Sequence, residues 1–319
     1  MSDPRCHPLI ELDRATIEAM LAPVLRGAGI RGIAATEGGL TNTVCRVTAD
    51  DGMVVALRVY PSDRSGFDLE RRLLPRLEAA LPVPHVLFAD AGGAGGHPYL
   101  VYRWIEGITL NECRRQVAPA ELGVLAEPLG RLLARVASQP PDGAMRNERI
   151  AIRIAEADAQ LRAGLVRERI GGALSDRLRE RLEAGAEELN ALDRSTGLVH
   201  GDFGGRNLLV RTVGDGGWEI SGVIDWESAA VGAALWDVGH LFRYPRRYSP
   251  EFRAAFARGY RAEGGELPRD WWRLARLLDA TRLVATLGEP RELPGVFATC
   301  LELIASVAED WDCAPARRA

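Results

Sequence analysis

The spacing of hydrophobic positions changes along the chain and divides it into two parts. In the first part, short segments of strand character are separated by turns, and two segments repeat their apolar residues at helical spacing. The predicted strands are 33–35, 43–48, 54–60, 85–89 and 99–104, and the predicted helices are 12–28 and 67–81. Asp51-Gly52, a dipeptide typical of tight hairpins, separates two of these strands. The pattern predicts a small antiparallel sheet that carries one helix, preceded by an N-terminal helix.

From residue 121 onward, the helical period dominates. Ser249-Pro250 supplies an N-cap side chain and a proline at the first helical position, which marks the start of one helix. The predicted helices are 121–138, 148–165, 173–191, 250–263, 269–287 and 293–311, and a β insertion over 197–225 contributes strands at 208–211 and 219–224.

The two patterns together predict an α+β fold with two lobes. We expect the sheet-containing N-terminal lobe to comprise residues 1–103 and the larger, mainly helical lobe to comprise residues 104–313. Residues 314–319 are expected to form a disordered tail.

The composition is that of an ordinary soluble protein. The chain has 319 residues, of which 47% are hydrophobic and 26% charged, and its five cysteines are scattered without a C-x-x-C pair. A formal net charge of -4 argues against nucleic acid or an anionic membrane as the main partner. Residues 1–11 lack the apolar segment of a signal peptide, and no run of about 18 apolar residues occurs. We therefore expect a cytoplasmic protein, monomeric or homodimeric, without nucleic-acid or membrane partners.

All 40 basic residues other than histidine are arginines, because the sequence contains no lysine. This excludes a P-loop of the form G-x-x-x-x-G-K-[ST] and every mechanism that needs a lysine Schiff base. Any phosphate-binding cation of the chain must therefore be an arginine.

The densest group of polar residues with chemical potential lies between 198 and 227. Asp202 and Asn207 stand on a glycine-rich segment before a strand, and Asp225 ends the apolar strand that follows. A carboxylate can accept the proton of an attacking hydroxyl, and carboxylate and amide oxygens suit a hard cation such as Mg²⁺. These residue types together favour phosphoryl transfer.

The same segment resembles the aminoglycoside phosphotransferase and choline kinase group, which has a protein-kinase-like fold. The resemblance rests on His-Gly-Asp-x-x-x-x-Asn at 200–207, Ile-Asp-x-Glu at 224–227 and Trp236-Asp237. It implies that Asp202 is the catalytic base and that Asn207 and Asp225 hold the Mg²⁺ ions that bridge the ATP phosphates. It also implies that Asp237 braces the catalytic loop, whereas His200 is expected to be a buried packing residue.

The N-terminal third fits the nucleotide-binding part of such a fold. The segment Val55-Ala56-Leu57-Arg58 occupies the strand on which protein kinases place a phosphate-binding lysine, and Glu70 on the next helix matches its acidic partner. Glu70 as an ordinary solvated helix residue is the alternative. The remaining predicted ATP-binding residues are Gly38, Gly39, Thr41 and Asn42 in a turn between strands, and Tyr102 and Trp104 at the hinge strand.

The resemblance implies an ATP- and Mg²⁺-dependent phosphotransferase that acts on a hydroxyl of a small molecule. An aminoglycoside-like antibiotic is the first expected acceptor, which would give the protein a role in antibiotic resistance. Glu227 would either contact the metal through water or reach the substrate. The alternatives are a metabolic kinase for choline, an amino alcohol or a sugar, and a nucleotide-binding pseudokinase that acts through partners. The sequence does not identify the acceptor.

Overall fold

The computed structural model describes residues 9–36, 42–61, 64–92, 94–214 and 216–309. Its contacts divide the chain into two compact units. Within the described residues, the sheet unit contains the chain up to Val117 and Arg206–Ser228, whereas the helical unit comprises Ala118–Gly205 and the chain from Ala229 onward. The boundary expected between 103 and 104 assumed two contiguous lobes and stays a prediction. The expected tail, 314–319, lies outside the described residues.

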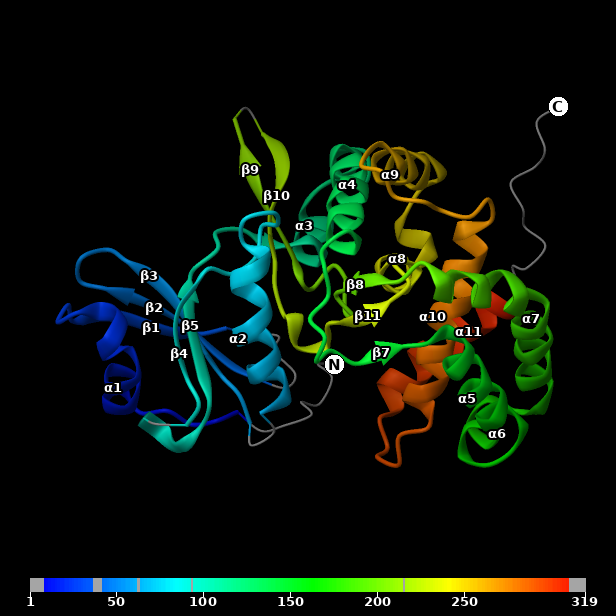
Figure 1. The fold of residues 1–319 in the computed structure, drawn as a ribbon, viewed down its shortest axis with the longest axis horizontal. Helices are drawn as coiled ribbons and strands as arrows, with labels where there is room; N and C mark the ends of the chain where they lie inside the picture. The colour runs from blue at the N-terminus through cyan, green and yellow to red at the C-terminus, as the bar shows by residue number, and fades with distance from the viewer. Residues whose placement is uncertain (1–8, 37–41, 62–63, 93, 215, 310–319) are drawn as a thin grey trace. The chain divides into compact units, whose positions relative to one another are not determined.

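Helices and strands follow one another along the chain, and most of them are labelled in Figure 1. The α-helices are α1 (Arg14–Leu25), α2 (Ser65–Leu77), α3 (Leu110–Gln116), α4 (Ala126–Ala137), α5 (Ile150–Arg162), α6 (Leu165–Ile170), α7 (Gly172–Ala191), α8 (Leu235–Leu241), α9 (Pro250–Ala262), α10 (Trp271–Leu287) and α11 (Pro294–Glu309). The strands are β1 (Ile30–Ala35), β2 (Thr43–Ala49), β3 (Val54–Val59), β4 (Val86–Asp90), β5 (Tyr99–Arg103), β6 (Ile108–Thr109), β7 (Asn147–Glu148), β8 (Gly197–Val199), β9 (Leu208–Val213), β10 (Gly217–Val223) and β11 (Ala230–Gly232).

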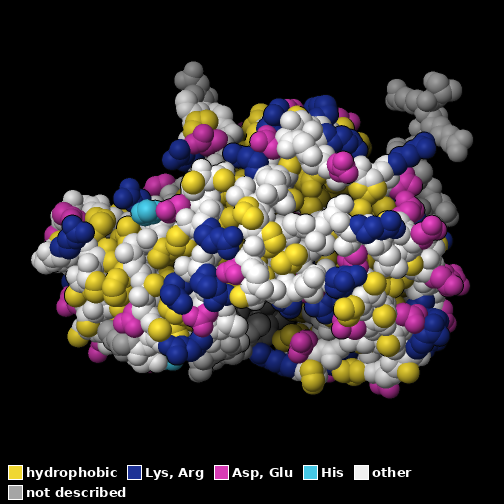
Figure 2. All heavy atoms as spheres, viewed as in Figure 1, with side chains coloured by type: hydrophobic (Ala, Val, Ile, Leu, Met, Phe, Trp, Pro, Cys, Tyr) yellow, Lys and Arg dark blue, Asp and Glu magenta, His cyan; other side chains and the backbone are white. Residues whose placement is uncertain are grey.

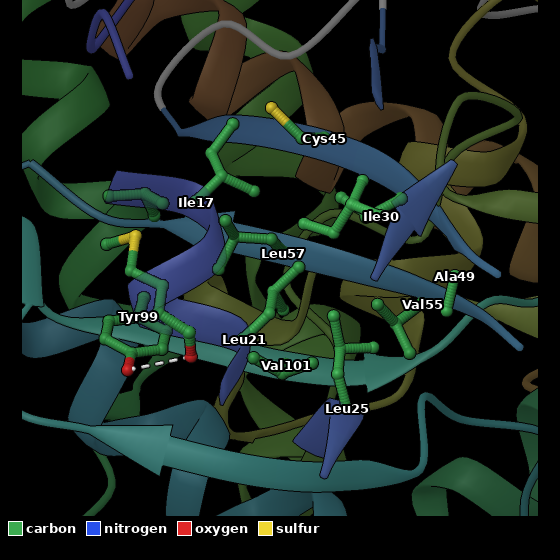
Figure 3. Close-up of a cluster of buried hydrophobic side chains, with 13 residues drawn as sticks. Ile17, Leu21, Leu25, Ile30, Cys45, Ala49, Val55, Leu57, Tyr99 and Val101 are labelled. Carbon is green, nitrogen blue, oxygen red and sulfur yellow. Dashed lines mark hydrogen bonds between the residues drawn. The ribbon is translucent and has the colours of Figure 1, made fainter. Parts of the chain in front are cut away.

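The main sheet of the sheet unit is antiparallel, with strand order β1-β2-β3-β5-β4. Because side chains alternate along a strand, β3 presents Val55 and Leu57 to one face and Arg58 and Tyr60 to the other. The first face packs on α1, as Figure 3 shows for Leu57 and Leu21, and the second face meets α2 through the Tyr60 ring. Helices therefore cover both faces of β3, which explains why Arg58 is buried with the apolar residues of this strand.

A second, three-stranded sheet of the same unit positions two of the predicted site residues, Asn207 and Asp225. The antiparallel hairpin of β9 and β10 pairs Leu208 with Val223. Just beyond this pair, the N–H of Ile224 donates to the carbonyl oxygen of Asn207 at 2.9 Å. The hairpin therefore places Asn207 beside the residue that precedes Asp225, although the two are distant in sequence.

In the helical unit, α4 and α9 cross at very short range. A Cβ added at Gly130 would lie 2.1 Å from the carbonyl oxygen of Phe256, and one added at Gly259 would lie 2.1 Å from that of Glu127. Glycine is thus required at both helices because backbone meets backbone there. The helix α10 packs on α8 and brings its side chains under the loop that follows β8.

The predicted α+β class is confirmed, and every long helix and strand predicted from the sequence is present within a few residues. Ser249 caps α9 by accepting from the Phe252 N–H, as its sequence indicated. The helices α3, α6 and α8, each of seven residues or fewer, were not predicted because they span about two turns, too few for a periodic pattern. No helix among the described ranges is long and apolar enough to cross a bilayer. Figure 2 shows arginines and acidic side chains interspersed over the face that it draws.

Candidate active site

The loop 200–204, which carries Asp202, is anchored from α8 by a buried carboxylate. Asp237 is fully buried, and its two oxygens accept the N–H groups of His200 at 2.6 Å and Gly201 at 2.9 Å. Burial raises the pKa of Asp237, while His200 and the two backbone hydrogen bonds act in the opposite direction. The predicted role of Asp237 as a brace of this loop is confirmed.

Two further contacts fix the same loop. Arg282 of α10 donates to the carbonyl oxygen of Gly201, a residue whose φ of +82° favours glycine. The backbone N–H of Asp202 donates to His200 Nδ1 at 3.1 Å, and the buried His200 ring packs edge-on against Phe203. His200 is therefore the buried, hydrogen-bonded packing residue that the sequence indicated.

The Asp202 side chain is the part of this loop that reaches solvent. It is 30% exposed, and one carboxylate oxygen lies 2.8 Å from Nε2 of His240 on α8. A carboxylate that is held at one oxygen on a rigid loop and is partly open to solvent can accept a proton from a bound hydroxyl. The geometry is therefore compatible with the predicted base, a role that stays a prediction.

In the sheet unit, Arg58 lies at the centre of a buried cluster of acids. Its Nη2 donates to Asp225 at 2.5 Å and to Glu227 at 2.9 Å, and its Nε lies 3.3 Å from Glu70 without hydrogen-bond alignment. The side chains of Asp225 and Glu227 are 31% and 23% exposed, whereas that of Arg58 is 6% exposed. Despite desolvation, the charges of Glu70 and Asp225 hold the pKa of Arg58 above its usual value.

Glu70 links α2 to the segment that carries the other acids. One of its oxygens accepts the backbone N–H of Trp226 at 2.6 Å, and the other accepts the hydroxyl of Tyr60. Burial raises the pKa of Glu70 to about 7, against the opposing charge of Arg58. The alternative of a solvated helix residue is wrong, because Glu70 is only 2% exposed.

The surroundings of Asp225 fit a divalent cation. Asp225 has a φ of +69°, a left-handed conformation that costs free energy in a residue other than glycine and is typical of functional positions. One arginine faces three carboxylates in this cluster, which leaves an excess of negative charge. No group of three acidic, histidine or cysteine side chains suited to a metal occurs among the described residues. Mg²⁺ in nucleotide sites needs only one or two carboxylates, because phosphates and water supply the remaining oxygens.

The other predicted nucleotide-binding residues are only partly described. Gly38, Gly39 and Thr41 lie outside the described residues, while Asn42 donates through its amide to Glu227. Glu227 is therefore tied to Arg58 and Asn42, two predicted ATP-binding residues, and its predicted contact with the acceptor stays untested.

Tyr102 and Trp104 lie at the end of the interior strand β5. Burial raises the pKa of the Tyr102 hydroxyl to about 12, and the Arg58 charge acts against this rise. The backbone N–H of Trp104 donates to the carbonyl oxygen of Val54 at 3.2 Å, so it is engaged within the sheet. An adenine contact at this hinge strand stays a prediction.

Sequence reasoning missed three side chains: Tyr60 in the cluster of acids around Arg58, and His240 and Arg282 at the loop 200–204. His240 and Arg282 act on the loop 200–204 from positions distant in sequence, whereas Tyr60 lies two residues after Arg58, and the alternation of faces along β3 could have indicated it. A histidine or arginine on a helix carries no comparable sequence signal.

Comparison with known proteins decides the family. The model of the phosphotransferase enzyme family matches residues 32–277, which include the loop 200–204 and the cluster of acids around Arg58. The chain belongs to the phosphotransferase enzyme family. It is 31% identical over 230 residues to viomycin phosphotransferase of Streptomyces vinaceus, an alignment that covers 70% of this chain and 76% of that protein. The predicted class of enzyme, a small-molecule phosphotransferase, is confirmed.

Solved structures of other phosphotransferases share the fold. The GDP and kanamycin complex of an APH(2″) enzyme has a TM-score of 0.71 at 17% identity and covers 92% of this chain and 98% of that one. Macrolide 2′-phosphotransferase from Brachybacterium faecium, as the apoenzyme, has a TM-score of 0.66 at 20% identity and covers 92% and 98%. The expected kinase-like fold is thereby confirmed.

Proposed function

We propose that this phosphotransferase transfers the γ-phosphoryl group of ATP to a hydroxyl of a small antibiotic, with Mg²⁺ as the metal. The observation that carries the proposal is the Asp202 carboxylate, which is held on an anchored loop and is partly open to solvent. The family membership supplies the reaction class in which such a carboxylate has a use.

In the proposed reaction, Asp202 accepts the proton of the acceptor hydroxyl as its oxygen bonds to the γ-phosphorus. The bond between that phosphorus and the β–γ bridging oxygen breaks, and ADP leaves. Arg58 would orient phosphate oxygens, and Asn207 with Asp225 would hold Mg²⁺, whose charge lowers the repulsion between the phosphates and the incoming oxygen. The excess of carboxylates around Arg58 supports the metal assignment, since it calls for a balancing cation beside Asp225.

An antibiotic acceptor is supported by the names of the similar proteins. These are a viomycin phosphotransferase, a kanamycin complex and a macrolide phosphotransferase. The viomycin enzyme is the relative with the higher sequence identity, so viomycin is the first acceptor to test. A metabolic kinase for choline, an amino alcohol or a sugar is the second candidate, because the two groups share the motifs on which the resemblance rests.

The test is ADP release from ATP and Mg²⁺ in the presence of viomycin, kanamycin, a macrolide or choline, with phosphorylation of the acceptor followed by mass spectrometry. Asp202→Ala should lower the turnover by at least about 10²-fold, the scale of positioned acid–base catalysis, while ATP binding persists. Asp270→Ala, a change of an exposed aspartate of the helical unit, is the matched control. Transfer to choline alone would favour a metabolic kinase, and ATP binding without any transfer would favour a pseudokinase.

A further inference from the structure

His240 lies directly against the carboxylate to which we assign proton transfer. It is the sixth of the seven residues of α8, its side chain is 13% exposed, and its Nε2 lies 2.8 Å from Asp202 Oδ1. Both residues belong to the helical unit. Asp237 holds the backbone beside Asp202, whereas His240 holds the Asp202 side chain.

The second ring nitrogen of His240 faces an arginine, and this decides which nitrogen carries the proton. Arg243 Nη2 lies 3.3 Å from His240 Nδ1, and Arg243 is itself fixed by two hydrogen bonds to Asp279, at 2.8 and 2.7 Å. A guanidinium can only donate, so Nδ1 must accept. The proton of the neutral ring therefore sits on Nε2, where it can be donated toward Asp202.

A glycine in the loop makes room for this ring. A Cβ added at Gly204 would lie 2.9 Å from His240 Cδ2 and 3.0 Å from its Nε2, closer than side chains pack. The N–H of Gly204 also donates to the Asp202 carbonyl oxygen at 2.7 Å, which turns the chain back over the ring. The approach of His240 to Asp202 therefore depends on the absence of a side chain at 204.

We propose that His240 is a positioning residue, which orients the Asp202 carboxylate by donating from Nε2 to Oδ1. A partly exposed aspartate can rotate about two side-chain bonds, and a hydrogen bond to one oxygen removes much of that freedom. With Oδ1 bound, the plane of the carboxylate is set before the acceptor arrives, and proton transfer depends steeply on such geometry. The proposal rests on the role of Asp202 as the base in the proposed function.

The test compares two amides at position 240. In His240→Gln the side-chain amide nitrogen reaches the place of Nε2 and can donate to Asp202. In His240→Asn the amide ends near Nδ1, where it still meets Arg243 but cannot reach Asp202. The kcat for ADP release with ATP, Mg²⁺ and viomycin should fall about 10- to 100-fold in His240→Asn, with the KM for ATP unchanged, and His240→Gln should recover most of the loss. The same pair of changes at His85, an exposed histidine of the sheet unit, should leave kcat at the wild-type value.

Gly204→Ala supplies a second route to the same displacement, because it moves the ring without changing its chemistry. It should lower kcat as His240→Asn does, and thermal melting of each variant will show that the fold is kept. A wild-type kcat in His240→Asn would overturn the proposal, as would equal losses in the two amide variants. If His240→Asn does not fold, His240→Gln and Gly204→Ala decide, since wild-type activity in Gly204→Ala contradicts a role for the ring position. If Asp202→Ala keeps its activity, the assignment of the base fails instead.

Discussion

Asp237→Asn tests whether the loop that carries Asp202 is held by a buried charge. The two oxygens of Asp237 each accept one backbone N–H, at 2.6 Å from His200 and 2.9 Å from Gly201. Asparagine has the same shape, but it has one oxygen and one NH₂ group. One backbone donor would therefore face another donor, and the remaining hydrogen bond would lose its charge.

The size of the effect follows from these contacts. Loss of a hydrogen bond to a charged group costs about 1.5–3 kcal/mol, and the weakening of the second bond adds to this loss. The neutral amide is easier to bury than the carboxylate, whose pKa burial raises, so part of the loss is offset. We expect a net destabilisation of about 2–3 kcal/mol, which corresponds to a fall in Tm of roughly 3–5 °C for a protein of this size.

Differential scanning calorimetry of Asp237→Asn and of the control Asp270→Asn measures this difference. Asp270 lies in the same unit, is 56% exposed and is 3.7 Å from Arg273, so its replacement should change the stability by less than about 0.5 kcal/mol. Equal melting temperatures for the two variants would show that the carboxylate of Asp237 contributes nothing beyond its shape, and the loop could not then be held by a buried charge.

Three further predictions concern packing, nucleotide and metal. Gly130→Ala should lower the Tm sharply, because its Cβ would meet the Phe256 carbonyl oxygen at 2.1 Å. The control Gly123→Ala, where nothing lies within 4 Å, should not lower the Tm. Equal melting curves for the two variants would contradict a backbone contact at the crossing of α4 and α9. Arg58→Ala should weaken ATP binding in titration calorimetry, and wild-type affinity would remove Arg58 from the phosphate site. Addition of EDTA should abolish phosphoryl transfer and Mg²⁺ should restore it, whereas transfer in EDTA would exclude the proposed metal.

Sequence reasoning performed best where one segment carries its own signal. The β3 segment was predicted from its β-branched run, and α9 was predicted from Ser249 and Pro250, which set its first turn. The loop with Asp202 was located because glycines and polar residues follow one another there in a fixed spacing. Each of these signals lies within about fifteen residues of chain.

The contacts around the predicted residues could not be obtained in this way. Arg58 meets Glu70, Asp225 and Glu227, which come from separate segments of the chain, and only the pair with Glu70 was expected. His240 reaches Asp202 because α8 packs on α10 below the loop, a relation that depends on the tertiary fold. Local spacing contains no information about contacts between distant segments. The predicted site residues therefore do not include the side chains that contact them, such as His240.

The loop 200–204 and the cluster of acids around Arg58 differ in how closely stability and the proposed chemistry are coupled. In the helical unit the tasks are divided, since Asp237 and Arg282 hold the loop while Asp202 carries the carboxylate that we propose as the base. In the sheet unit the proposed phosphate contact and the stabilising ion pairs belong to the same residue, because the burial of Arg58 in a strand covered on both faces is possible only with carboxylates around it. Removal of Arg58 would leave those carboxylates without their counter-charge, so the loss of a phosphate contact and the loss of stability should appear together. Replacement of Asp202 should, in contrast, lower turnover with little change in Tm. The Asp202 side chain is partly exposed, and Asp237 and Arg282 hold the loop in its place.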